Sequence, residues 1–178
     1  LIGKMLDVEH CVHVGGNIGT PLLGIIGDIT REDWVVLELS SFQLEILHQS
    51  PNIAVVTNIT PNHLDVHPSM EAYIAAKKRI FQFQSSNDIL VVNYDDPTTR
   101  AFAEQAKGKV YFFSRRTELE QGAFVRDERI IVRNVPPVAS SAERDLCSVD
   151  ELRLIGAHNV ENVLAAVTAA ALAGASPE

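Results

Sequence analysis

The chain lacks several features that would place it in a specialised class of protein. Its two cysteines, Cys11 and Cys147, have no metal-binding spacing, so we expect two reduced, buried thiols in a cytoplasmic protein. No apolar run approaches the roughly 20 residues of a membrane-spanning helix, and no stretch resembles a signal peptide. The Gly-Lys-Ser/Thr triplet of a nucleotide-binding P-loop is also missing.

Positive charge is scarce as well. Fifteen Lys and Arg residues against 23 Asp and Glu residues give a formal net charge of −8, which argues against broad binding to nucleic acid or anionic membranes. Phosphate ligands are not excluded, because backbone amides at a helix N-terminus bind them locally. The length of 178 residues and the hydrophobic content of 46% are typical of a globular domain with a substantial core.

Apolar runs that predict buried strands alternate with predicted helices up to residue 113. The predicted strands are 11–14, 34–39, 53–57, 89–92 and 110–113, and the predicted helices are 1–6, 21–27, 41–47, 70–83 and 97–106. This alternation predicts an α/β fold with a mostly parallel, doubly wound sheet and right-handed crossovers.

The pattern changes after residue 113. Residues 123–133 predict a hairpin, 134–145 a loop, 147–154 a further strand, and 158–173 an Ala-rich helix. The hairpin would form a small antiparallel addition at one edge of the sheet. Residues 1–6 resemble the tail of a helix already under way, so we expect this chain to be an excised piece of a longer protein.

Polar side chains with metal-binding capacity follow two predicted strands. Glu38 ends one strand, where either an Arg partner or a hard cation would account for its charge. His63, Asp65 and His67 follow another strand. Each has an ordinary structural interpretation, and Asp65 is alternatively a turn cap or a partner that orients His63. Because ligands bind at the carboxyl ends of parallel strands, these positions are candidates for a site.

Further candidates lie beside helix starts. Residues 15–19, Gly-Gly-Asn-Ile-Gly, suit either a phosphate cradle or a purely steric need for glycine. Ser40 is expected as an N-cap, and Gln43 lies one turn later. Lys77 belongs to a charged run that is either solvated or close to the strand ends. Asn159 and Asn162 are poor interior helix formers and suggest caps or ligand contacts.

Five ordered motifs resemble those of the Mur ligases, and the resemblance covers nearly the whole chain. They are Gly15-Gly16-Asn17-Ile18-Gly19, Glu38-Leu39-Ser40-Ser41-Phe42-Gln43-Leu44-Glu45, Asn58-Ile59-Thr60-Pro61-Asn62-His63-Leu64-Asp65, Ala75-Ala76-Lys77 and Gly156-Ala157-His158-Asn159-Val160-Glu161-Asn162. The similarity is weakest over 115–150. The second motif is typical of the family member that adds D-glutamate to UDP-N-acetylmuramoyl-L-alanine.

The resemblance implies that residues 1–178 form the central, ATP-binding domain of an amide ligase in peptidoglycan precursor synthesis. ATP would phosphorylate the carboxylate of UDP-N-acetylmuramoyl-L-alanine, and the amine of D-glutamate would attack the acyl phosphate. Mg2+ would neutralise the transferring phosphoryl group. The implied parent protein is a cytoplasmic monomer without nucleic-acid or membrane partners.

The resemblance also implies a role for each candidate residue. Glu38 and His63 match magnesium ligands, and Lys77 matches a lysine that is carbamylated and then binds magnesium. The other matches are to substrate-binding positions: Asn17, Ser40 and Gln43 for the muramoyl nucleotide, and Asn159 and Asn162 for the adenine.

The departures from the family pattern matter equally. The P-loop expected before Leu1 and the N-terminal and C-terminal domains are missing, so we expect no turnover from this chain alone. Three alternatives stay open: another Mur-type ligase such as folylpolyglutamate synthase, a binuclear metallohydrolase using His63, Asp65, His67 and a carbamylated lysine, and a non-catalytic structural domain.

Overall fold

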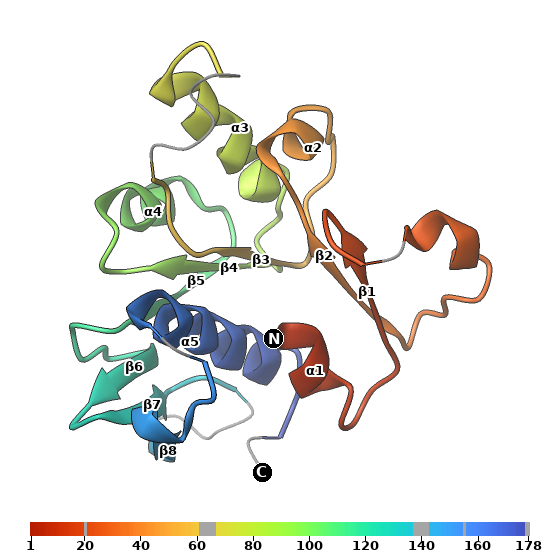
Figure 1. Cartoon of the computed structure of the whole chain (residues 1–178). Helices are drawn as coiled ribbons and strands as arrows, with labels where there is room; N and C mark the ends of the chain where they lie inside the picture. The colour runs from red at the N-terminus through yellow and green to blue at the C-terminus, as the bar shows by residue number, and fades with distance from the viewer. Residues whose placement is uncertain (20, 61–66, 137–142, 155, 177–178) are drawn as a thin grey trace.

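The computed structural model describes residues 1–19, 21–60, 67–136, 143–154 and 156–176. Helices and strands alternate along most of the chain, as the sequence predicts (Figure 1). In chain order the elements are α1 (Ile2–Leu6), β1 (Val12–Gly16), η1 (Leu22–Ile25), β2 (Trp34–Glu38), α2 (Ser41–Glu45), β3 (Ile53–Val56), α3 (Met70–Gln82), β4 (Ile89–Asn93), α4 (Pro97–Phe102), η2 (Ala103–Gln105), β5 (Lys109–Ser114), β6 (Gly122–Arg126), β7 (Arg129–Arg133), β8 (Glu143–Ser148), η3 (Val149–Glu151) and α5 (Ala157–Leu172).

The described strands form two sheets where the sequence predicted one. β1 and β2 pair in parallel, and a second sheet has the order β3-β4-β5-β6-β7-β8. Pairing is parallel from β3 to β6 and antiparallel from β6 to β8. The α/β class and the antiparallel addition at one edge are therefore confirmed. The sheet is divided because, among the described strands, β2 has β1 as its partner, β3 has β4, and no ladder joins β2 to β3.

The larger sheet is buried on both faces because its strands are apolar at consecutive positions. In β4, Leu90 and Val92 face α3 and α4, whereas Val91 belongs to the cluster on the α5 side. Figure 1 shows α3 and α4 on one side of β3–β5 and α5 on the other.

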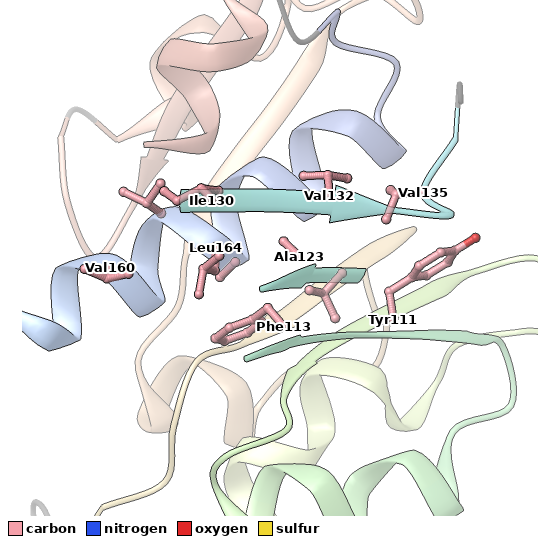
Figure 2. Packing of buried hydrophobic residues seen from close by; sticks show 11 residues of the cluster. Tyr111, Phe113, Ala123, Ile130, Val132, Val135, Val160 and Leu164 are labelled. Atoms are coloured by element: carbon pink, nitrogen blue, oxygen red, sulfur yellow. The ribbon is translucent and has the colours of Figure 1, made fainter. Parts of the chain in front are cut away.

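The largest apolar cluster joins α5 to the strands of the larger sheet. Figure 2 shows Val160 and Leu164 of α5 in the same cluster as Phe113 of β5, Ala123 of β6 and Ile130 of β7. Phe113, Ala123, Ile130 and Leu164 have no exposed surface. Alanines on α5 allow the helix to approach the sheet closely.

The smaller sheet packs on one face against α1 and the end of α5. Val12, Trp34 and Val36 contact a small cluster that includes Leu6 and Ala170. Val35 and Leu37 alternate with these residues and are 41% and 48% exposed. Cys11 is exposed and Cys147 is half-buried, and both are free thiols; the prediction of two buried thiols is therefore wrong for Cys11, which precedes β1 outside the cover of the helices.

Two predicted elements are wrong in extent. The helix predicted over 21–27 is a single 3-10 turn with Pro21 before it. The strand predicted over 147–154 begins earlier and ends at Ser148, where a capping box with Glu151 starts a 3-10 turn. None of the helices that the structure describes is long and apolar enough to cross a bilayer.

Candidate functional site

A wide cleft of about 1030 Å³ lies between the two sheets. The end of β2 and the end of β3 line it from two sides, and α1, α2, α3 and α5 contribute further lining residues. Five of the sequence-predicted site residues line this cleft: Asn17, Glu38, Ser40, Lys77 and Asn162. The structure thus brings together residues that are up to 145 positions apart (162 − 17) in the chain. The carboxyl ends of parallel strands form the rim, as expected for an α/β site.

Glu38 is held where β1 and β2 end together. Gly16 pairs with Glu38 in the parallel register, and the amide of Asn17 donates to the Glu38 carbonyl at 2.7 Å. Asn17 Nδ2 also donates to Glu38 Oε1 at 3.5 Å. Gly16 has φ +99°, and a Cβ there would collide with the Glu38 carbonyl, so the steric interpretation of this glycine is confirmed. The Glu38 side chain is left available for a ligand in the cleft.

Lys77 reaches the cleft from α3. Its side chain is half-buried, and its Nζ lies 5.8 Å from the centre of the Tyr73 ring. Burial lowers the pKa of the Lys77 ammonium, and the negative charge of Glu38 offsets part of that shift. A lysine with a lowered pKa has more of its amine in the neutral form, which is the form that adds CO2. Lys77 and Glu38 line the same cleft.

Ser40 and Gln43 form a complete capping box at the start of α2. The Ser40 hydroxyl accepts from the Gln43 amide at 3.3 Å, and Gln43 Oε1 accepts from the Ser40 amide at 2.9 Å. The structural role expected for Ser40 is therefore present. Ser40 also lines the cleft, whereas Gln43 is not among its lining residues.

The remaining candidates divide between the cleft and its surroundings. Asn162 lines the cleft from α5, and Asn159, about one turn earlier on the same helix, does not. His63 and Asp65 lie outside the described residues.

His67 is a structural residue rather than a ligand presented to the cleft. Its Nε2 shares a hydrogen bond of 2.8 Å with the hydroxyl of Ser41, and its Nδ1 lies 3.4 Å from a carboxylate oxygen of Glu45. Its ring stacks on Phe42 at 5.1 Å, and the residue is 3% exposed. Both ring nitrogens are engaged, which removes one ligand from the metallohydrolase hypothesis.

The cleft also contains residues that the sequence did not single out. Lys4 of α1 and Tyr73 of α3 line it. Tyr73 has helical spacing to Lys77, four residues later, and this was a usable signal. No sequence signal pointed to Lys4, because its position depends on how α1 packs against α5 and β1.

Comparison with known proteins assigns the chain to a family. Residues 17–170 match the model of the Mur ligase middle domain. The chain belongs to the Mur ligase family. It is 53% identical over 178 residues to a UDP-N-acetylmuramoylalanine–D-glutamate ligase from Symbiobacterium thermophilum, covering 98% of this chain and 38% of that protein. A protein with the same name from Acetivibrio thermocellus is 52% identical over 170 residues, covering 95% and 35%.

Solved structures of other Mur ligases have the same fold. MurF from Acinetobacter baumannii superposes with a TM-score of 0.68 at 19% identity, covering 98% of this chain and 40% of that one. MurF from Thermotoga maritima in complex with ADP gives 0.60 at 20% identity, covering 93% and 40%. This chain thus spans less than half the length of each of these four relatives.

Proposed function

We propose that this chain is the central, ATP-binding domain of a ligase that joins D-glutamate to UDP-N-acetylmuramoyl-L-alanine in the cytoplasm. The observation that carries the proposal is the 53% identity, over 98% of the chain, to a ligase named for that reaction. Identity of 52% to a second such ligase supports the same choice within the family. The 13–21% identity to the MurF, murein peptide ligase and FolC structures supports no competing substrate.

The cleft supports the proposal that residues 1–178 are part of a larger central domain. Among the described strands, β2 and β3 each leave one edge without a ladder partner, and the end of each strand lines the cleft. Open, parallel-oriented edges of this kind accept a further strand. We infer that a strand leading into the P-loop of the whole protein occupies part of this space, and that its backbone amides bind the ATP phosphates.

The donor atoms around Glu38 and Lys77 fit Mg2+. A carboxylate is present, and addition of CO2 to the neutral Lys77 amine would supply a second oxygen anion, a combination that hard cations prefer. In the proposal Glu38, His63 and carbamylated Lys77 hold the metal, which would neutralise negative charge on the phosphates of ATP.

The chain's own residues then position the reactants. Asn17 and Ser40 line the cleft beside Glu38 and are proposed to bind the muramoyl nucleotide with Gln43. Asn162, with Asn159 one turn away, is proposed to contact the adenine. ATP phosphorylates the substrate carboxylate, releasing ADP, and the amine of D-glutamate displaces phosphate from the acyl phosphate to form the amide. The half-buried setting of Lys77 strengthens electrostatic interactions in the site.

Substrate choice tests the proposed reaction. The full-length protein, given ATP, Mg2+ and UDP-N-acetylmuramoyl-L-alanine, should release phosphate with D-glutamate and not with L-glutamate or diaminopimelate. Release with a folate and L-glutamate would instead favour the folylpolyglutamate synthase alternative. The 178-residue chain alone should release none; turnover by it would refute the proposed need for the P-loop segment.

Lys77 and its neighbour provide a matched test of the site. Lys77→Arg keeps the positive charge but removes an amine that can add CO2, because a guanidinium stays protonated. In the full-length protein we expect kcat to fall at least about 100-fold, the scale of losing a preorganised electrostatic group. Lys78→Arg, on the same helix beside Phe102, should retain turnover. Equal activity of the two variants would exclude the proposed role of Lys77.

A further inference from the structure

A second cluster of metal-binding side chains lies at the amino ends of β1 and β2, away from the cleft. Its members are Cys11, His13 and Asp33. Asp33 precedes Glu38 by five residues, a rise of about 16 Å along an extended strand. The cluster is therefore separate from the proposed magnesium site.

Strand geometry brings the three side chains onto one face. Cys11 and His13 are two residues apart, so their side chains point the same way. Val12 pairs with Trp34 in the parallel register, which places Asp33 beside Cys11. The opposite face carries Val12 and Trp34, which pack toward α1. The cluster thus lies on the face of the small sheet opposite α1.

The ligand atoms lie close enough together to surround one zinc ion. His13 Nε2 lies 3.0 Å from Asp33 Oδ2 and 3.8 Å from Cys11 Sγ, and the three ligand atoms all lie within 4.8 Å of one another. Zinc bonds of about 2.0 Å to nitrogen or oxygen and 2.3 Å to sulfur, at tetrahedral angles, place ligand atoms roughly 3.3–3.6 Å apart. Small side-chain adjustments would therefore accommodate the ion.

Hydrogen bonds orient the side chains of the cluster, and solvent has access to them. The amide and hydroxyl of Thr30 donate to the Asp33 carboxylate at 3.0 and 2.9 Å, which fixes its orientation as hydrogen bonds around metal ligands commonly do. His13 and Asp33 side chains are 18% and 10% exposed, and Cys11 is exposed. An ion from solvent can reach all three ligands.

We infer that Cys11, His13 and Asp33 bind one Zn2+ ion, with water in the fourth position. A thiolate and an imidazole favour zinc over the hard cation proposed for the cleft, and a single carboxylate completes three protein ligands. Binding requires the lone pair of His13 Nε2, so the ring proton moves to Nδ1 and the hydrogen bond to Asp33 is replaced by two bonds to the ion. The Cys11 thiol binds as a thiolate and releases its proton to solvent. The ion would then tie together the amino ends of β1 and β2.

Cobalt substitution tests this site without any assay of turnover. Titration of the metal-free full-length protein with Co2+ should produce a saturable thiolate-to-cobalt charge-transfer band, and Zn2+ but not Mg2+ should abolish it. Cys11→Ser should remove the band, whereas Cys147→Ser, which changes the half-buried thiol of β8, should leave it intact. Asp33→Asn keeps an oxygen that can accept from Thr30 but loses the negative charge of the ligand. It should weaken Co2+ binding at least about tenfold, because changing even a hydrogen-bond partner of a metal ligand costs that much.

A second measurement separates a bound ion from a nonspecific one. Zn2+ should slow amide hydrogen exchange in β1 and β2 in the wild type and have no such effect in the Cys11→Ser variant, because ligands stabilise the state that binds them. Absence of a charge-transfer band, or a band that survives Cys11→Ser, would overturn the inference. Circular dichroism of each variant identifies any that fails to fold.

Discussion

The two sheets of this molecule differ in how completely they are covered. β4 of the larger sheet has Leu90, Val91 and Val92 with no exposed surface, whereas Val35 and Leu37 of the smaller sheet are nearly half exposed. The larger sheet therefore supplies most of the apolar burial that stabilises the chain. The proposed site lies at the junction: Glu38 comes from the less supported sheet and Lys77 from a helix on the better supported one. Its geometry thus depends on how the two sheets are held together.

Truncation of one apolar side chain in each sheet should give the largest contrast in stability. Phe113→Ala, at the centre of the cluster on α5, should lower the free energy of unfolding by about 3–5 kcal/mol, through lost transfer energy and the cavity left behind. Leu37→Ala, at a position already 48% exposed, should cost about 0.5 kcal/mol. Urea denaturation of the 178-residue chain measures both. Comparable losses would mean that the smaller sheet is as tightly packed as the larger one.

The same contrast explains which elements the sequence could predict. β4 was predicted within one residue because a strand buried on both faces must be apolar throughout. The start of β8 was missed because Glu143 and Asp145 are charged, and they pair across the sheet with arginines, Glu143 with Arg126 and Arg133 and Asp145 with Arg129. Ion pairs stabilise that strand without leaving an apolar pattern. Its end was predictable from Ser148 and Glu151, which form the capping box.

Five of the residues that line the cleft could be named from the sequence, but the shape of the cleft could not be predicted. Glu38 and Lys77 were expected together from the family resemblance, and the structure places them around one cleft. The separation of β2 from β3 could not be predicted, because strand alternation gives the number of strands and not which edges remain unpaired. His67 resembled a ligand in sequence, yet its place against Ser41 and Phe42 depends on packing between α2 and α3.

Substitution of one glycine in each sheet should give an effect of intermediate size on stability. Gly16 of β1 and Gly122 of β6 both have positive φ, and a Cβ at either would collide with a carbonyl of the neighbouring strand, that of Glu38 or Phe112. Alanine at either position should cost about 1–3 kcal/mol in local strain. For Gly122→Ala we expect the urea midpoint of global unfolding to fall, because Ala123 and Phe124 of β6 are fully buried in the core.

For Gly16→Ala the strain should be released locally. Amide hydrogen exchange should accelerate in β1 and β2 while β4 and β5 keep their protection, because weakly packed segments open independently of the core. If Gly16→Ala lowered the midpoint of global unfolding as much as Gly122→Ala does, the two sheets would unfold as one cooperative unit.

The smallest effect concerns a turn that occurs before a strand in each sheet. Asp88 precedes β4 and accepts from the amide and hydroxyl of Ser85 at 2.7 and 2.8 Å, as Asp33 before β2 does from Thr30. These hydrogen bonds lower the pKa of Asp88 below its usual 3.8, and the bond from the Ser85 backbone amide contributes most. The charged form is therefore favoured by folding, and its contribution is present above pH 3.8 and is lost as the pH falls through the lowered pKa. Asp88→Asn should reduce the urea midpoint at pH 6 and reduce it less at pH 3. If the decrease in urea midpoint were the same at both pH values, the charge of Asp88 would not stabilise the turn.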